Sequence, residues 1–273
     1  MSRMTGIEDH YIAFAIRLAD AARSVMRRHA AEGLGVEVKP DRSLVTRMDR
    51  AIEVELRAMI RAEYPGHGII GEEEGNEGLG ASHIWVLDPI DGTAPFIVGI
   101  PVWGTLIALA VEGEPVLGVI DVPGADARWL GVAGRATVLN DRAVRTRGCG
   151  GLASALMTNS NQDYMSADEL PVLEALRRRT ATRVYGGACL NYGRLAEGRS
   201  DLAIDAGQKI FDFAPFRPVI EGAGGIITDW AGRPLTLEST GRVLAAGDRR
   251  CHAEALDLIA ELGVADPVPQ PAP

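Results

Sequence analysis

The first part of the chain carries apolar residues at helical spacing in two stretches. Within residues 7–29, the positions of Ile7, Phe14 and Leu18 belong to a pattern that recurs every three or four residues, which predicts a long amphipathic helix. The same spacing predicts a second helix over 47–62. The segment "VEVKPDRSLVT" between them contains a Pro-Asp turn and indicates a surface loop or hairpin.

After Pro65-Gly66 the pattern changes to short apolar runs separated by glycine and proline turns. Runs of this kind predict β-strands. They read "HGII", "IWVLD", "WGTLIALAV", "PVLGVIDV" and "ARWLGVA". The residues 1–147 are therefore predicted to form an α+β part.

Beyond about residue 148, strand and helix patterns alternate. Strands are predicted near 155–158, 182–185, 201–205, 225–229 and 242–246, and helices near 168–178, 189–197, 212–223 and 252–262. This alternation predicts an α/β part over 148–263, with helices covering its sheet. The boundary rests on the glycine-rich "RGCGG", and the proline-rich end, 264–273, is predicted to be disordered.

Composition narrows the class of protein. The chain has 273 residues, of which 47% are hydrophobic and 24% charged, as in soluble globular proteins. A net charge of −9 gives no footprint for nucleic acid or an anionic membrane, and no apolar run is long enough to span one. The three cysteines form no CxxC pair, and the amphipathic N-terminus does not resemble a signal peptide. We expect a cytoplasmic protein that binds neither nucleic acid nor membrane.

Three apolar runs end in carboxylates. In the second, "IWVLDPIDGT", Asp88 follows a buried strand, Pro89 forces a turn, and Asp91 can point back to the same side. Two carboxylates this close repel each other unless a cation lies between them or one is protonated. Oxygen ligands without nearby His or Cys favour Mg²⁺, Mn²⁺ or Ca²⁺ over zinc.

Each acidic run also has a purely structural explanation. Asp88 and Asp91 could cap backbone amides in an Asx-type turn, the glutamates of "GIIGEEEGNEG" could belong to a solvated loop, and Asp212 in "KIFDFAPFRPVIEGAGG" could cap a helix. The same pattern occurs three times, however. One shared metal site explains this better than three coincidences.

These segments together resemble a known family. "GEE" at 71–73, "DPIDGT" at 88–93 and "FDFAPFRPVIEGAGG" at 211–225 are similar, in order and spacing, to the signature of the inositol monophosphatase family of Mg²⁺-dependent phosphomonoesterases. The resemblance implies a layered αβαβα sandwich, with a metal-binding part over 1–147 and a substrate-binding part over 148–263. It also implies a cleft site with two or three Mg²⁺ ions, or Mn²⁺, and a homodimer.

The resemblance assigns site residues one by one. Metal ligands would be Glu72, Asp88, the backbone carbonyl of Ile90, Asp91 and Asp212. The segment "LVTRMD" resembles one whose aspartate pairs with the threonine of "DGT", which would put Asp49 beside Thr93. Glu72, or Thr93 held by Asp49, would orient an attacking water, with no covalent intermediate. A first-turn helix carboxylate is the alternative for Asp49.

Phosphate and substrate contacts follow from the same resemblance. Asp91 and the backbone amides of Gly92 and Thr93 would bind the phosphate, and Lys39 would lie on a mobile loop near the metals. Gly187 and Ala188 in "YGGACLNYGRLAEG" would contact the alcohol part of a phosphate monoester. Asp205 would hydrogen-bond a substrate hydroxyl or amine; a strand-end carboxylate in solvent is its alternative.

The identity of that substrate is a choice between two. The carboxyl-terminal third is most similar to the histidinol-phosphatase branch, which favours histidinol phosphate. That branch, however, commonly has aspartate at position 188. The alanine of this chain departs from it and favours inositol 1-phosphate. The chain also has Phe211, Pro95 and Val98 where the family usually has tryptophan, asparagine and histidine, and these departures affect the shape of the pocket rather than the metal ligands.

Two other functions compete with this interpretation. A haloacid-dehalogenase phosphatase would need a nucleophile at position 89, where this chain has proline, so an aspartyl-phosphate mechanism does not fit the motif. A non-catalytic regulatory or scaffold protein could keep the same fold. Retention of all four carboxylate ligands argues against it, because a scaffold has no need for clustered charge.

Overall fold

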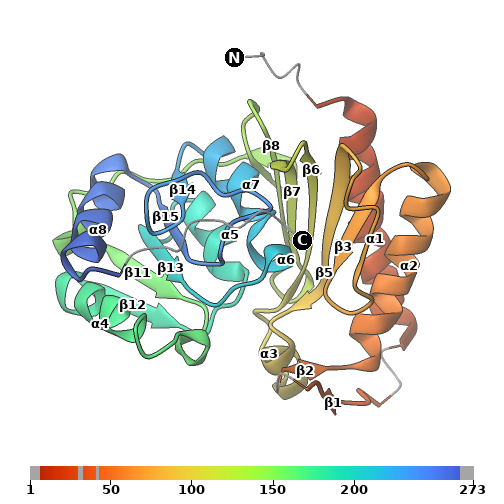
Figure 1. Ribbon diagram of the computed structural model, residues 1–273, viewed down its shortest axis with the longest axis horizontal. Coiled ribbons are helices and arrows are strands. Elements are labelled where there is room, and N and C mark those ends of the chain that lie inside the picture. The colour runs from red at the N-terminus through yellow and green to blue at the C-terminus, as the bar shows by residue number, and fades with distance from the viewer. Residues whose placement is uncertain (1–6, 30–32, 41–42, 265–273) are drawn as a thin grey trace.

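The protein is built of alternating helical and sheet layers (Figure 1). The computed structural model describes residues 7–29, 33–40 and 43–264. Helices α1 (Asp9–His29) and α2 (Arg47–Glu63) cover the outer face of an eight-stranded sheet. Further helices separate this sheet from a five-stranded one, and two more cover the outside of the second sheet. The predicted αβαβα sandwich is thereby confirmed.

The eight-stranded sheet is formed by the first half of the chain. Its order is β10 (Arg142–Ala143), β9 (Val138–Leu139), β8 (Ala127–Val132), β7 (Glu114–Val122), β6 (Gly104–Val111), β5 (His83–Asp91), β3 (Gly68–Gly71) and β4 (Asn76–Glu77). Strands β3 and β5 run parallel, and the other neighbours run antiparallel. The five predicted runs form strands. The two-residue strands and helix α3 (Thr93–Val98) are too short to give a sequence pattern.

The five-stranded sheet lies in the second half. Its order is β12 (Thr182–Tyr185), β11 (Leu156–Asn159), β13 (Leu202–Asp205), β15 (Val243–Ala246) and β14 (Ile226–Thr228). On its outer face lie α4 (Leu170–Arg179) and α8 (Arg249–Glu261), and on its inner face α5 (Leu190–Ala196) and α7 (Phe216–Gly222). Short 3₁₀ turns span Pro123–Ala125, Leu152–Ser154 and Gln162–Tyr164.

One predicted helix is wrong in its extent. Instead of a single helix over 212–223, the chain forms α6 (Ile210–Phe213), a break, and then α7. Pro215 lies at the start of α7, where the missing N–H of proline costs no intrahelical bond, and it cannot continue the ladder of α6. The segment 36–46, left open between loop and hairpin, contains the antiparallel pair β1 (Glu37–Val38) and β2 (Leu44–Val45).

The two sheets share a core across the middle helical layer. Leu106 and Trp129 of the first sheet and Ala203 and Val243 of the second belong to one cluster with residues of α5 and α7. The next residue of β15, Leu244, faces the outer helices instead, as the two-residue period of a strand requires. The division at 147/148 stays a prediction. Of the predicted tail, 265–273 lie outside the described residues.

Glycines let α7 approach the first sheet closely. A Cβ added to Gly118 would lie 2.1 Å from the carbonyl oxygen of Pro215, and one added to Gly131 would lie 2.4 Å from the backbone of Pro218 and Val219. No larger side chain fits there without moving the backbone. The contact brings α6, just before α7, against the first sheet.

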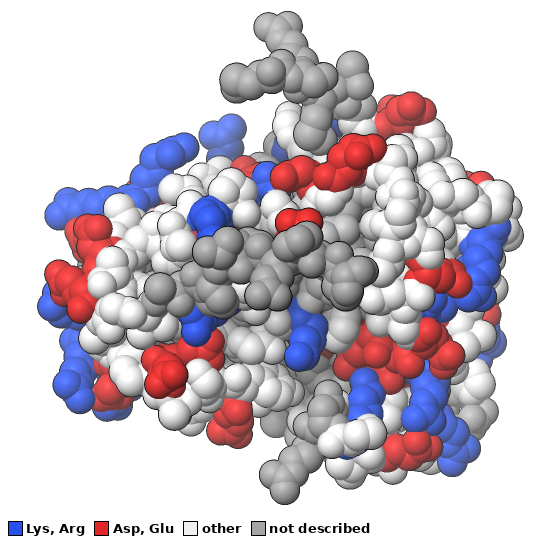
Figure 2. All heavy atoms as spheres, in the orientation of Figure 1, with Lys and Arg blue, Asp and Glu red and all other residues white. Residues whose placement is uncertain are grey.

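Two surface properties bear on function. On the face drawn in Figure 2, Lys and Arg side chains are scattered among Asp and Glu rather than joined in one basic stripe. Over the part of the chain that the structure describes, no helix combines the length and the apolar character needed to cross a bilayer.

Candidate active site

A bulge at the end of β5 positions the two aspartates of "DPIDGT". Pairing with β6 is regular up to Asp88 opposite Leu106 and resumes at Asp91 opposite Gly104. The hydroxyl of Thr105 donates a 2.9 Å hydrogen bond to the carbonyl of Pro89 inside the bulge. Such an irregularity changes the direction of the side chains, and here it brings the carboxylates of Asp88 and Asp91 close together.

Asp212 joins these two residues from the other half of the chain. One carboxylate oxygen from each of Asp88, Asp91 and Asp212 lies within 4.8 Å of the others. The other expected role of Asp212 is also present, because its Oδ2 accepts a 2.6 Å hydrogen bond from the backbone N–H of Lys209 at the start of α6. Oδ1 of Asp88 is buried and has no hydrogen-bond partner. These carboxylates therefore have acceptor capacity that the chain does not use.

The cluster is electrostatically unfavourable without a cation. Burial, and then the charges of neighbouring carboxylates, raise the pKa of Asp88 and of Asp212 well above the usual value. Burial also raises the pKa of Asp91, although the N–H of Cys189 donates a 2.6 Å hydrogen bond to its Oδ2. A hard divalent cation fits these oxygens, because it would neutralise the charge and occupy the unused lone pairs.

Glu72 approaches the cluster from the loop after β3. Nζ of Lys39 lies 3.0 Å from Glu72 and 2.7 Å from Glu73. Burial opposes the charge of Lys39, but hydrogen bonds to the two glutamates raise its pKa to about 12. Burial raises the pKa of Glu72 as well, and the charge of Glu72 contributes to the raised pKa of Asp88. Lys39 thus pairs with an expected metal ligand.

Two residues that hold this loop were not predicted. Glu53 of α2 is fully buried, accepts hydrogen bonds from the N–H groups of Glu73 (2.8 Å) and Glu74 (3.0 Å), and pairs with Arg57. A Cβ on Gly71 would meet the Glu53 carboxylate at 2.0 Å. The available signal was a pair of charged residues on the apolar face of the helix predicted over 47–62.

The expected pair of Asp49 and Thr93 is not hydrogen-bonded. Asp49 is fully buried at the start of α2, where its Oδ2 accepts hydrogen bonds from the N–H and hydroxyl of Thr46. The hydroxyl of Thr93 donates its single proton to the carbonyl of Ile90 at 3.1 Å. Asp49 therefore has the alternative role, a helix-capping carboxylate, but its Oδ1 remains buried without a partner.

The segment before α5 lies against the aspartate loop. Ala188 adopts the left-handed φ of +46°, and a Cβ on Gly92, whose φ is +81°, would lie 3.0 Å from that of Ala188. A Cβ on Gly187 would meet Asn191 at 2.0 Å. Together with the bond from Cys189 to Asp91, these contacts bring the predicted substrate segment next to the carboxylates.

Asp205 is buried rather than solvated, so its solvent-exposed alternative is wrong. Its Oδ1 accepts hydrogen bonds from Asn159 (2.9 Å) and the N–H of Ser160 (2.8 Å), and its Oδ2 from the hydroxyls of Ser160 (2.9 Å) and Tyr192 (2.8 Å). Burial nevertheless raises the pKa of Asp205 to about 7. Contact with substrate stays a prediction, and would require one of these bonds to be exchanged.

The three departures from the family pattern lie around this site in different environments. Phe211 of α6 packs against the small core cluster that contains Ile70 and Val86. Pro95 is within α3, and Val98, at the end of α3, has 69% of its surface exposed. None of them is one of the clustered carboxylates.

The chain is similar to known proteins over most of its length. A family model, the inositol monophosphatase family, matches residues 8–263. The chain belongs to this family. A solved inositol monophosphatase from Zymomonas mobilis, described for a flexible region at its active site, superposes with a TM-score of 0.84 at 40% identity. The match covers 92% of this chain and 98% of that one.

The curated relatives carry several names. Bifunctional phosphatase IMPL2, chloroplastic, of Arabidopsis thaliana is 40% identical over 258 residues, which cover 91% of this chain and 75% of the relative. The histidinol-phosphatase of Mycobacterium tuberculosis is 34% identical over 226 residues (80% and 86%), and Nus factor SuhB of Pseudomonas aeruginosa 32% over 256 residues (90% and 94%). As a member of the inositol monophosphatase family, the chain is a phosphoric monoester hydrolase.

Proposed function

We propose that the protein is a Mg²⁺-dependent phosphomonoesterase that hydrolyses a small polar alcohol phosphate by direct attack of water. The observation that carries this proposal is the approach of Asp88, Asp91 and Asp212, from two halves of the chain, to within 4.8 Å of one another. A purely structural role does not account for three clustered carboxylates whose pKa values are all raised, first by burial and, for Asp88 and Asp212, also by the charge of Asp91.

We assign the following roles. The metal ligands are Glu72, Asp88, the carbonyl of Ile90, Asp91 and Asp212, for two or three Mg²⁺ ions, with Mn²⁺ as a substitute. Divalent ions held by these oxygens would neutralise charge and lower the pKa of a water molecule. The N–H groups of Gly92 and Thr93, at the start of α3, bind phosphate oxygens. Glu72 and Thr93 orient the water, and Asp49 supports Thr93 once the Thr93 hydroxyl leaves Ile90.

Phosphate release from an aryl phosphate tests the reaction. We expect turnover with Mg²⁺, none in EDTA, and recovery when Mg²⁺ is added back. Substitution of a clustered aspartate by asparagine should also abolish turnover. Asp257→Asn is the matched control, because Asp257 is exposed on α8, far from the carboxylate cluster. Activity that persists in EDTA would contradict the requirement for metal. An inactive protein that still binds Mg²⁺ through these carboxylates would favour the non-catalytic alternative; one relative, SuhB, carries the name of a Nus factor.

For the substrate we favour histidinol phosphate, with inositol 1-phosphate as the alternative. Relatives named histidinol-phosphatase support the first. Ala188, a small residue where the histidinol-phosphatase branch commonly has aspartate, supports the second. Asp205 would pair with a cationic amine or imidazole through the shared network of Ser160 and Tyr192.

A panel of phosphate monoesters at equal concentration separates these substrates by kcat/KM. Histidinol phosphate is expected to exceed both inositol 1-phosphate and a generic aryl phosphate. Asp205→Ala is expected to lose this selectivity and to keep generic turnover, whereas an equal loss for every substrate would mean that Asp205 acts only by holding the fold. If histidinol phosphate is no better than the aryl phosphate, the substrate proposal fails while the reaction stands.

The proposal also covers the oligomeric state and the location of the protein. A homodimer is proposed because β12 is an open edge strand whose Val184 and Tyr185 are 48% and 42% exposed. Light scattering should give about twice the chain mass of 29.1 kDa.

A cytoplasmic location is proposed because the three cysteines are all free thiols, as is usual in a reducing compartment. Fractionation of the source cells tests this, since one relative is named as chloroplastic.

A further inference from the structure

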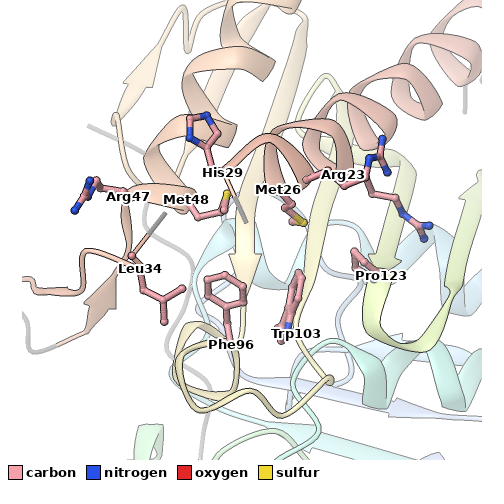
Figure 3. Close-up of a pocket in the computed structure, with 11 residues that line it drawn as sticks. Arg23, Met26, His29, Leu34, Arg47, Met48, Phe96, Trp103 and Pro123 are labelled. Carbon is pink, nitrogen blue, oxygen red and sulfur yellow. The ribbon is translucent and has the colours of Figure 1, made fainter. Parts of the chain in front are cut away.

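A pocket of about 520 Å³ lies between the C-terminal half of α1, the start of α2 and α3 (Figure 3). This volume is within the range of sites for small ligands. Its wall is largely apolar and is formed by Met26, Leu34, Met48, Phe96, Trp103 and Pro123. None of the residues assigned above to catalysis, metal or substrate lines it, so it is separate from the carboxylate cluster.

The charged residues of the pocket are all basic. Arg23, Arg27 and Arg47 line it, and none of its described lining residues is acidic, in a chain whose net charge is −9. Figure 3 shows Arg23 and Arg47 on opposite sides, with Phe96 and Trp103 between them. Arg23 is already held by two 2.8 Å hydrogen bonds to Asp121.

The guanidinium N–H groups of the other two arginines are available to a ligand. Arg27 and Arg47 are exposed, and within the described residues neither guanidinium group forms a hydrogen bond or an ion pair. An apolar wall beside unpaired guanidinium groups is complementary to a molecule that has an apolar body and an anionic group.

The pocket also touches the segment that carries Thr93. Phe96 belongs to α3, which begins at Thr93, and its ring packs edge to face on that of Trp103 at 4.8 Å between centroids. A Cβ on Gly92 would lie 3.4 Å from the Cα of Trp103. A molecule against these two rings is therefore one layer of atoms away from the loop of the catalytic site.

We propose that this pocket is a second ligand site, which binds a small amphipathic anion: an apolar ring or chain bearing one phosphate, sulfonate or carboxylate group. Its occupant packs on Phe96 and Trp103 and pairs with Arg27 and Arg47. The proposal goes beyond the phosphatase function and does not depend on it.

Intrinsic fluorescence gives a direct readout of binding. Trp103 is the one partly exposed tryptophan, because Trp85, Trp129 and Trp230 are at most 3% exposed. The probe is cyclohexanesulfonate, which neither absorbs near 280 nm nor carries a phosphate to hydrolyse. It is titrated in EDTA, so that the uncompensated carboxylates of the other site repel it. We expect a saturable change in emission that Trp103→Phe abolishes.

Neutral and cationic analogues test the role of charge. Cyclohexanol and cyclohexylammonium should bind at least about tenfold more weakly than the sulfonate, and Arg27→Gln combined with Arg47→Gln should weaken sulfonate binding by about the same factor. Equal binding of all three analogues would overturn the proposal. A midpoint that shifts with protein concentration would do so too, because a second copy of the chain would then be the occupant.

A steric block tests the location. Gly33 lines the pocket, an added Cβ there has nothing within 4 Å, and its φ is not in the left-handed region, so Gly33→Phe adds bulk without strain. Gly66 has the same open surroundings outside the pocket, which makes Gly66→Phe the matched control. Sulfonate binding should be lost in Gly33→Phe only. Unchanged binding in Gly33→Phe would overturn the assignment of the pocket.

Discussion

At the scale of single residues, the site depends on carboxylates whose charge the fold makes costly. Asp91 illustrates this. One of its oxygens accepts a hydrogen bond from the N–H of Cys189, which stabilises its charge, but that charge raises the pKa of Asp212. The repeated pattern of an apolar run that ends in carboxylates predicted one shared metal site, and the family resemblance assigned Asp88, Asp91 and Asp212 to it. The structure brings these three carboxylates together, and their role as metal ligands stays a prediction. The expected hydrogen bond between Asp49 and Thr93 does not form, because the Thr93 hydroxyl donates its single proton to the carbonyl of Ile90.

Asp91→Asn should separate catalysis from folding. The amide oxygen can still accept the N–H of Cys189, but the charge that a cation needs is lost. We expect kcat to fall by about two orders of magnitude or more. The midpoint of thermal unfolding in EDTA should rise, because one of three repelling carboxylates is removed.

Asp168→Asn, at an exposed position, is the control for both measurements and should change neither. A variant with near-normal turnover would remove Asp91 from the catalytic site. A variant that loses activity and stability together would indicate that Asp91 mainly holds the loop.

Asp205 should make the stability of the protein depend on pH. Burial raises its folded-state pKa from 3.8 to about 7. The unfolded chain therefore loses this proton first, and the stability contributed by the protonated group, complete below pH 3.8, is lost as the pH rises through about 7. Asp205→Asn removes this titration. The difference in free energy of unfolding between pH 5 and pH 8, from urea titrations, should be smaller in the variant by on the order of 2 kcal/mol.

Glu73, whose pKa is also raised to about 7 by burial, titrates in the same direction and remains in both proteins, so only the difference between them reports on Asp205. An identical pH dependence in wild type and variant would mean that the four hydrogen bonds keep Asp205 ionised throughout.

At the scale of elements, periodicity predicted long helices and strands better than short ones. The amphipathic patterns of α1 and α2 extend over several turns, so their limits agree with the prediction to within two residues. The break between α6 and α7 was missed because the apolar pattern continues across it, although Pro215 and Pro218 were visible in the sequence. Strands of two residues contain no period at all.

The close packing of α7 on the eight-stranded sheet can be tested by a glycine substitution. Gly131→Ala places a Cβ 2.4 Å from the backbone of Pro218 and Val219, and neither backbone segment can yield as a side chain would. We expect a loss of on the order of 1–3 kcal/mol in the free energy of unfolding, measured with urea. Gly80→Ala, where an added Cβ has nothing within 4 Å and φ is ordinary, should be nearly neutral. Equal effects would show that helix and sheet are not in this close contact.

At the scale of the whole molecule, the site exists because two halves of the chain share one core. Neither the cluster around Leu106 and Val243 nor the meeting of Asp88 with Asp212 follows from local pattern. The recurrence of the acidic runs indicated one shared site, and the family resemblance named the residues that form it. The pocket beside Phe96 had no sequence signal, since its wall is drawn from several separate segments between Arg23 and Pro123.

Metal binding should therefore stabilise the whole fold, and more so at high pH. The raised pKa values of Asp88, Asp91 and Asp212 mean that, without metal, stability falls as the pH rises above the usual aspartate range. Mg²⁺ binds the ionised carboxylates, so it competes with protons at low pH. At a hundredfold excess over its dissociation constant, Mg²⁺ would add about 2.7 kcal/mol to the free energy of unfolding.

Calorimetry in EDTA and in MgCl₂, at pH 5 and pH 8, should show the larger rise in melting temperature at pH 8. KCl at equal ionic strength controls for screening, and Asp91→Asn should reduce the rise. An equal rise at both pH values, or the same rise with KCl, would show that the carboxylate cluster is not where Mg²⁺ acts.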